Sequence, residues 1–323
     1  LQSSQTEREA FAFVTRTKCL ALHSPLLHSQ KRRDITSIAH LRQAEWKTAV
    51  QWLKRAHVAD LLVDEADLRV SELRHLESVL VQTTISIKAQ DRALVWQLRM
   101  IKTARELKIM QKAGQIAAQA LVRLHHELKI GMTELDAVRL LEQIMGELGA
   151  NAPAFPTIVA FDRHTANPHH IPGKTALAPE MPVLIDCGAQ FEGYCSDLTR
   201  TIWFGTQPSH DFRLLENIVT TAYALGTDQL LHPPQDPAEL TGHSLDSAVR
   251  AHIEEKGHGA HFIHTTGHGV GIAIHEPPSC SPQDKTPLRP GMVLTIEPGI
   301  YLPGKIGYRH ENTLVLKKKG FAN

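Results

Sequence analysis

Cysteine is scarce in this sequence, and its distribution indicates neither a disulfide framework nor a thiolate zinc site. The 323 residues contain four cysteines, which form no CxxC pair and no even ladder. This pattern is typical of a reduced cytoplasmic protein with small buried thiols.

An excess of one charge is also absent. Lysine and arginine number 35 against 34 aspartate and glutamate, which gives a formal net charge of +1. Bulk charge therefore gives no argument for a nucleic-acid or membrane partner. No apolar run approaches the roughly 18 residues that a membrane span needs, and the polar first residues carry no signal-peptide pattern. We expect a cytoplasmic protein with no nucleic-acid and no membrane partner.

The length predicts two domains, at about 100–200 residues per domain. The first, residues 1–100, is expected to be a small α/β domain without a glycine-rich phosphate loop. Apolar residues at helical spacing occupy residues 38–56, and β-rich composition marks four further segments: 11–15, 19–22, 58–63 and 79–87. A boundary is expected within residues 88–103.

The second domain, residues 101–323, has an α+β pattern. Apolar residues at helical spacing predict a helix over residues 104–127. A second helix opens at the capping-box-like Thr133-Glu-Leu-Asp136 and stops at Gly149. From Phe155 onward short β runs alternate with proline and glycine, and two more helices are expected, at residues 212–231 and 244–256.

Two aspartates lie on the arms of a predicted hairpin. A short apolar strand ends in Asp186, and a second strand carries Asp197. If the turn is centred on Phe191-Glu192, the two aspartates face each other with Cβ atoms roughly 5 Å apart. Like charges opposed in this way destabilise a sheet unless a cation lies between them, although two exposed aspartates at a hairpin mouth would be the ordinary alternative.

Other candidate ligands follow later in the chain. His264, His268 and His275 share one glycine-rich stretch, where glycine lets the backbone approach a centre closely. Glu297 ends an apolar strand, and Glu311 lies inside another β run, where an ion pair with Arg309 is the ordinary alternative. Four carboxylates and one imidazole suit Mn²⁺, Co²⁺, Fe²⁺ or Zn²⁺, and five ligands suit two metals bridged by shared carboxylates.

These residues carry a resemblance to the pita-bread metallopeptidases, most similar to the Xaa-Pro aminopeptidases and the Xaa-Pro dipeptidases (prolidases). It covers about residues 101–316, with the motifs in the expected order. The first hundred residues resemble the family's N-terminal creatinase-like domain only loosely and look shorter at the start. The motifs are Ile185-Asp-Cys-Gly, Tyr194-Cys-Ser-Asp-Leu-Thr-Arg-Thr201, Gly267-His-Gly-Val-Gly, Ile274-His-Glu-Pro, Glu297-Pro-Gly-Ile-Tyr and Arg309-His-Glu-Asn.

The resemblance implies a role for each site residue. Asp186 would chelate one metal, and Asp197 and Glu311 would bridge both. His268 and Glu297 would complete the other metal, and Glu297 would also accept a proton from the attacking water. The remaining implied roles concern the substrate side and the support of the ligands: His169 on the substrate side, His264 and His275 against the peptide and the tetrahedral intermediate, and Arg309 steadying the bridging glutamate.

The implied function is removal of an N-terminal residue that precedes proline, with two divalent metal ions. Mn²⁺ is the expected metal, with Co²⁺, Zn²⁺ and Fe²⁺ as alternatives, and a homodimer is expected. A methionine aminopeptidase shares the five ligands but lacks an N-terminal domain of this kind. A peptide-binding module or a creatinase-like hydrolase on the same fold would have lost the ligands.

Two departures from the family pattern stand out. His310 replaces a common aliphatic residue and should point away from the metals by strand alternation. Phe161-Asp-Arg-His-Thr-Ala166 replaces a small Gly/Ser-rich segment on the substrate side, which leaves the specificity open.

Overall fold

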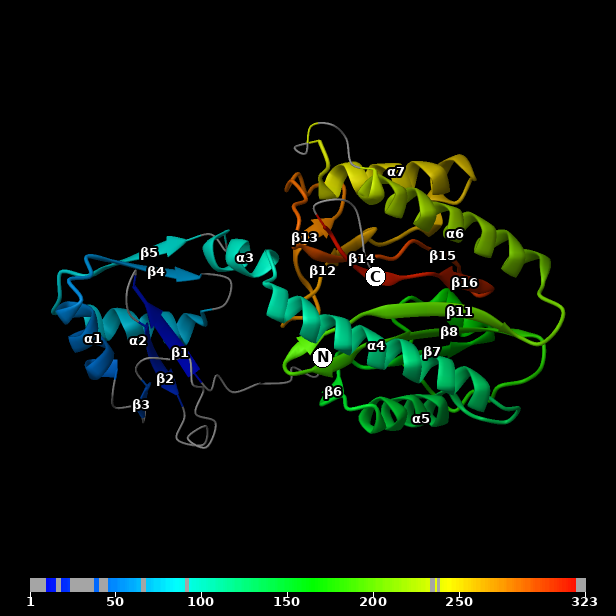
Figure 1. Ribbon diagram of the computed structural model, residues 1–323, viewed down its shortest axis with the longest axis horizontal. Helices are drawn as coiled ribbons and strands as arrows, with labels where there is room; N and C mark the ends of the chain where they lie inside the picture. Colours follow the sequence, from blue (N-terminus) through cyan, green and yellow to red (C-terminus); the bar gives the residue numbers. More distant parts are fainter. Residues whose placement is uncertain are drawn as a thin grey trace. The chain divides into compact units, whose positions relative to one another are not determined.

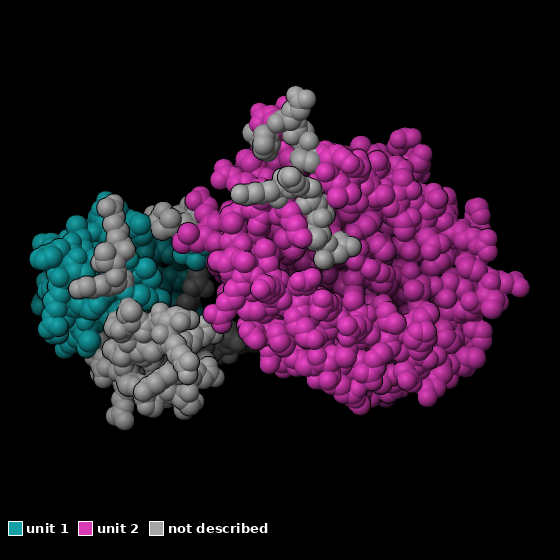
Figure 2. All heavy atoms as spheres, viewed as in Figure 1, with its two compact units in different colours: residues 1–95 teal, residues 96–323 magenta. Residues whose placement is uncertain are grey.

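The computed structural model divides the chain into two compact units, residues 1–95 and 96–323, coloured separately in Figure 2. The residues that the structure describes are 10–15, 19–23, 38–40, 46–64, 68–90, 93–232, 236 and 239–317. No helix among them is long and apolar enough to cross a membrane.

Among its described residues, the first unit has two small sheets and two helices. Strands β1 (Ala10–Val14) and β2 (Cys19–His23) are antiparallel, β2 is parallel to β3 (Ile38–His40), and β4 (Asp60–Asp64) is parallel to β5 (Ser86–Gln90). Helices α1 (Trp46–Arg55) and α2 (Val70–Leu80) bury Val50, Leu53, Leu76 and Leu80 in the core of this unit.

Two predictions in this unit were wrong in part. The helical spacing over residues 38–56 corresponds to a helix only from Trp46, because Ile38–His40 is a strand that pairs with β2, and residues 41–45 lie outside the described part. Residues 79–87 were expected to be a strand, yet Val79 and Leu80 end α2. Burial of Leu76 and Leu80, four residues apart, fixes that helix, and the strand begins only at Ser86.

The helices of the second unit agree with their predicted positions. After α3 (Ala93–Met100), which spans the division between the units, come α4 (Ala104–Glu127) and α5 (Glu134–Glu147). The predicted capping box at Thr133 is present, and Gly149 takes a positive φ of 102° after the end of α5. Helices α6 (His210–Leu231) and α7 (Gly242–Glu255) begin within two residues of the predicted starts.

Strands lie between these helix pairs, with α4 and α5 on one side and α6 and α7 on the other (Figure 1). Strand order in the main sheets is β11-β8-β7 and β13-β12-β14-β17, with β10-β9-β6 and β15-β16 as smaller sheets. Two of the described segments are short 3₁₀ helices, η3 (Asp162–Ala166) and η4 (Gly259–His261). The strand bounds are β6 Ala152–Pro153, β7 Ile158–Phe161, β8 Met181–Cys187, β9 Ala189–Phe191, β10 Tyr194–Cys195, β11 Leu198–Phe204, β12 Gly267–Gly269, β13 Glu276–Cys280, β14 Val293–Ile296, β15 Gly299–Leu302, β16 Ile306–Arg309 and β17 Asn312–Val315.

The register of the aspartate hairpin differs from the prediction by two residues. Asp186 in β8 faces Thr199 in β11, and Phe191 faces Tyr194. The turn is therefore Glu192-Gly193, both with positive φ (47° and 83°), the two-residue turn whose twist matches a hairpin. A shift of two residues preserves the face, so Asp197 remains on the side of the sheet that carries Asp186.

Candidate metal centre

All five predicted ligands line one cavity of about 550 Å³ in the second unit. Each lies on a strand or at a strand end. Asp186 is in β8, Asp197 immediately precedes β11, and His268 is in β12. Glu297 immediately follows β14. Glu311 lies in the break between β16 and β17, rather than inside a continuous strand as predicted.

His268 presents one ring nitrogen to the carboxylates. Its Nε2 lies 3.3 Å from Glu297 Oε1 and 3.6 Å from Asp197 Oδ2. Its Nδ1 is 3.0 Å from the carbonyl oxygen of Gly269, so Nδ1 carries the proton and donates it. The neutral ring is thereby left with a lone pair on Nε2 that points toward Asp197 and Glu297, the tautomer that a metal-binding imidazole requires.

Two buried carboxylate oxygens of the centre accept no hydrogen bond. They are Asp186 Oδ1 and Glu311 Oε1, while the other oxygen of each group is held. Ligand atoms of Asp197, His268 and Glu311 all lie within 4.8 Å of one another. Because an unpartnered buried carboxylate oxygen is costly, this donor set fits divalent cations bound among the five residues.

The electrostatics support the same interpretation. Burial raises the pKa of the Asp197 and Glu311 carboxyls well above their ordinary range, and the neighbouring carboxylates raise both further. Burial also raises the pKa of Glu297, whereas the neighbouring His264 and Arg309 lower it. Positive charge at the centre would act in the opposite direction and favour the ionised carboxylates.

Arg309 has a different direct partner from the one expected. Its Nη2 donates to Asp186 Oδ2 over 2.6 Å, and its Nε donates to Thr199 Oγ1 over 3.1 Å. The Thr199 hydroxyl in turn donates to Glu311 Oε2 over 2.5 Å. Arg309 thus holds Asp186 itself and reaches Glu311 through Thr199.

His264 is tied to Arg309 by a tyrosine. Arg309 Nη1 donates to the Tyr301 hydroxyl over 2.8 Å, and that hydroxyl lies 2.9 Å from His264 Nε2. His264 Nδ1 donates to the carbonyl oxygen of Thr265 over 2.8 Å, so Nε2 of the neutral ring accepts from Tyr301. Burial lowers the pKa of His264 and favours this neutral form.

The other two predicted histidines lie at the cavity wall. His275 immediately precedes β13, and its ring packs edge-on against His268 at 4.4 Å between centroids. His169 is exposed and lies in the loop after η3. Its backbone N–H donates to the side-chain oxygen of Asn167. His310, in contrast, packs against Tyr223 of α6 and is not among the cavity residues, as strand alternation predicted.

Three supporting residues received no role from sequence reasoning: Thr199, Thr295 and Tyr301. Thr295 accepts from the His268 N–H and donates to Glu297 Oε1 over 3.1 Å, so one hydroxyl sets two ligands. In the sequence, the only sign of their role was their position relative to the candidate ligands and motifs. Thr295 precedes Glu297 by two residues on one strand face, and Thr199 and Tyr301 stand inside the quoted motifs.

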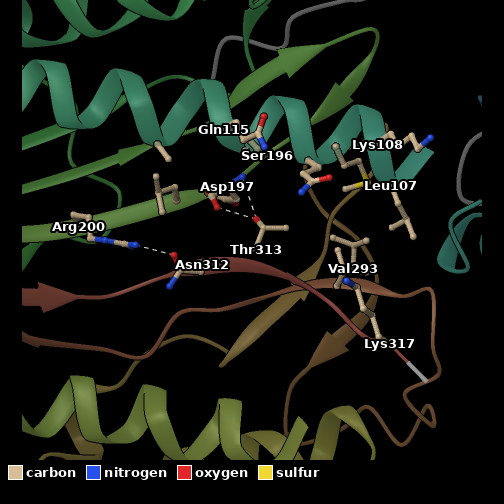
Figure 3. A pocket seen from close by; sticks show the side chains of 16 residues that line it. Leu107, Lys108, Gln115, Ser196, Asp197, Arg200, Val293, Asn312, Thr313 and Lys317 are labelled. Carbon is tan, nitrogen blue, oxygen red and sulfur yellow. Dashed lines mark hydrogen bonds between the residues drawn. The ribbon is translucent and has the colours of Figure 1, made fainter. Parts of the chain in front are cut away.

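A second cavity, of about 480 Å³, is also lined by Asp197 (Figure 3). Residues of α4 such as Leu107 and Gln115 form one wall, and Thr313 of β17 lies opposite them. The Thr313 hydroxyl accepts from the N–H of Asp197 and donates to its carbonyl oxygen, at 3.2 and 2.8 Å. The backbone of Asp197 is therefore fixed independently of its side chain.

Curated proteins match about 70% of the chain. A peptidase of Bacillus subtilis named YqhT, uncharacterized, is 37% identical over 226 residues, which is 70% of this chain and 62% of that protein. A Xaa-Pro dipeptidase of Pyrococcus furiosus is 38% identical over 227 residues, 70% of this chain and 63% of that protein. The matched part thus spans less than two thirds of these curated relatives.

Solved structures match nearly the whole chain. A Xaa-Pro dipeptidase from Bacillus anthracis superposes with a TM-score of 0.88 at 30% identity, covering 98% of this chain and 87% of that one. An X-Pro aminopeptidase from Thermotoga maritima gives 0.85 at 29% identity, covering 97% and 87%. A prolidase from Pyrococcus furiosus gives 0.84 at 30% identity, covering 97% and 88%. These likenesses confirm the predicted pita-bread α+β fold.

The family assignment rests on the second unit. The sequence model of metallopeptidase family M24 matches residues 108–318, which include the five candidate ligands and the four further site residues. This chain belongs to metallopeptidase family M24.

Proposed function

We propose that the chain is a metallo-exopeptidase that binds two divalent metal ions and removes an N-terminal residue preceding proline. The observation that carries the proposal is the pair of buried carboxylate oxygens without partners, on Asp186 and Glu311, within a cluster that also holds a correctly oriented imidazole. A site of this kind, built only for stability, would satisfy its own polar atoms.

The proposed ligand roles are those that the resemblance to the pita-bread metallopeptidases implies. Asp186 would bind one metal, and His268 and Glu297 the other, with Asp197 and Glu311 shared between them. Mn²⁺ is the proposed metal, because oxygen donors outnumber nitrogen and no thiolate takes part. Two cations held there would act as Lewis acids and lower the pKa of the water that attacks the peptide carbonyl.

The chain's own residues would handle protons and orientation. Glu297 lies 3.3 Å from His268 and has one oxygen held by Thr295, which leaves its carboxylate placed to accept the proton of the attacking water. His264, His275 and His169 line the same cavity and would contact the peptide and its leaving nitrogen. Histidine suits proton transfer near neutral pH.

The preference for proline is the finer part of the proposal. A proline in the second position makes a tertiary amide without an N–H, so the site must stabilise the intermediate and protonate the proline nitrogen by other donors. The structural relatives include both Xaa-Pro dipeptidases and an X-Pro aminopeptidase at similar likeness, which supports the class and leaves peptide length open. A methionine aminopeptidase is the competing function.

The homodimer, the cytoplasmic location and a creatinase-like N-terminal domain over residues 1–100 stay predictions.

The test compares matched peptides on the Mn²⁺-loaded protein. We expect kcat/KM for Xaa-Pro bonds to exceed that for Xaa-Ala bonds by at least about tenfold, or roughly 1.4 kcal/mol of differential transition-state binding. A Gly-Pro dipeptide and an Xaa-Pro-Pro tripeptide, assayed in parallel, distinguish dipeptidase from aminopeptidase activity. A preference for Met-Ala peptides would instead establish the methionine aminopeptidase function.

A further inference from the structure

Glu134, the first residue of α5, is fully buried and accepts four hydrogen bonds from one segment of the chain. Its Oε1 lies 2.8 Å from His164 Nδ1 and accepts the N–H of Phe161 over 2.9 Å. Its Oε2 lies 2.9 Å from His170 Nε2 and accepts the N–H of Gly173 over 2.8 Å. One carboxylate thus binds both ends of the segment 161–173, at Phe161 and Gly173, and two histidines within it.

The gathered segment forms a wall of the metal cavity. Pro168 and His169 line that cavity, as do Ile171 and Pro172, and residue Ile171 is 85% exposed. Two further side-chain hydrogen bonds join the segment to β16. Thr165 Oγ1 accepts the N–H of Gly307 over 2.9 Å, and the carbonyl oxygen of Pro168 accepts from Arg309 Nη1 over 3.5 Å.

The geometry around Glu134 is that of a closed hydrogen-bond cluster rather than a second metal site. Its three side chains have the ligand types for a cation. However, each histidine nitrogen meets a different carboxylate oxygen at hydrogen-bond distance, and the two rings stack at 4.4 Å. None of its side-chain atoms is among the buried unpartnered ones, in contrast to Asp186 and Glu311.

We propose that Glu134 is a positioning residue for substrate binding, which acts through His164 and His170 on the loop that carries Pro168 and His169. The inference rests on the proposed function, because it assigns that loop to the peptide. His164 belongs to the segment Phe161–Ala166, for which the sequence left the specificity open, and here its ring bonds to Glu134.

Replacement of Glu134 with glutamine is the direct test. The amide keeps the size of the side chain but turns one acceptor oxygen into an NH₂ donor, which then faces a ring N–H and a backbone N–H. The loop should loosen without loss of α5. We expect KM for an Xaa-Pro peptide to rise at least about fivefold in Mn²⁺-loaded Glu134→Gln, with kcat changed by less than about twofold, the pattern of lost binding.

Asp136→Ala is the matched control. Asp136 caps the same helix terminus by accepting from Thr133, and no bond from it to residues 161–173 is among the described contacts. Both variants should lower the thermal midpoint, but Asp136→Ala should leave KM unchanged. His164→Ala, which removes one of the four donors at a half-buried position, should raise KM by a smaller factor and serves if Glu134→Gln does not fold.

Amide hydrogen exchange separates this inference from the proposed function, because it needs no turnover. Faster exchange in residues 161–173 of Glu134→Gln, but not of Asp136→Ala, supports the clamp even if the protein cleaves no Xaa-Pro peptide. Equal exchange, or a fall in kcat at constant KM, would overturn the inference. A loss of one bound metal per chain in Glu134→Gln, measured by elemental analysis after Mn²⁺ or Zn²⁺ loading, would also overturn it and make the cluster a metal site.

Discussion

Arg309 and Asp186 form a buried ion pair, with 2.6 Å between Nη2 and Oδ2 and side-chain exposures of 4% and 13%. The same guanidinium donates to Thr199 and Tyr301. One side chain therefore orients a proposed metal ligand, a second ligand through Thr199, and His264 through Tyr301.

Arg309→Lys tests this arrangement. A single ammonium cannot reach Asp186, Thr199 and Tyr301 in the fork geometry of a guanidinium, so the ligands should be less well ordered before metal binding. We expect Mn²⁺ affinity to fall by about 10–100-fold, the usual effect of losing a group that orients ligands, as measured by calorimetric titration of metal-free protein. The exposed Arg139→Lys is the control, and equal affinity in both variants would contradict the prediction.

Asp197→Ala should abolish activity at little cost in stability. The substitution removes a proposed shared ligand, but it also removes a buried carboxyl whose pKa is raised by burial and by the neighbouring carboxylate of Glu311. Thr313 continues to hold the backbone at this position. We expect near-complete loss of turnover at saturating Mn²⁺ and a small change in the thermal midpoint of metal-free protein. Substantial residual turnover would argue against a two-metal mechanism.

Tyr301→Phe removes one hydroxyl from the chain between Arg309 and His264. His264 Nε2 then loses its donor, and the imidazole is no longer held in one orientation. We expect kcat/KM for an Xaa-Pro peptide to fall by about tenfold, less than the loss of a whole general acid–base group would cost, with bound metal unchanged. Metal content is measured on the same samples. A parallel loss of metal would show that Tyr301 supports the metal ligands rather than His264.

Acid stability should depend on Glu180, which is remote from the metal centre. Its carboxylate accepts from the N–H groups of Thr206 and Gln207 and from Trp203 Nε1, and these bonds lower the pKa of Glu180 from 4.5 to about 2. A lowered folded-state pKa stabilises the fold above pH 4.5, and that contribution is lost as the pH falls from 4.5 toward 2.

Thermal midpoints of wild type and Glu180→Gln, followed between pH 7 and pH 2.5, measure this contribution. The gap between them should be constant near neutrality and shrink below pH 4.5. A gap independent of pH would show that the carboxylate charge does not matter, and Glu192→Gln, also an exposed position with positive φ, controls for the loss of one surface charge.

The features that the sequence predicted are those encoded locally. Helices α4 and α5 carry their caps and apolar spacing within a few residues, so their ends could be located. The hairpin register could not be located, because it depends on Glu192 adopting a positive φ, which few residues other than glycine favour. Strand β3 is too short to show a period of its own.

The candidate ligands could be predicted because a carboxylate at the end of an apolar strand needs a partner. The residues that hold these ligands in place could not be predicted. Thr199 and Glu311 are 112 residues apart, and Arg309 and Asp186 are 123 apart, so no spacing reveals that they meet. The clamp on Glu134 was missed for the same reason, since a glutamate in a first helical turn ordinarily reads as a favourable interaction with the helix dipole.

The bonded path from Asp186 through Arg309 and Tyr301 to His264 also bears on regulation. If His264 contacts the peptide and Asp186 binds metal, the two binding equilibria share a conformational cost. Thermodynamic linkage then requires the effect to be mutual: substrate or product in the cavity should tighten Mn²⁺ binding by the same factor by which Mn²⁺ tightens theirs. At limiting metal, occupancy of the enzyme would therefore rise with the supply of its own peptides.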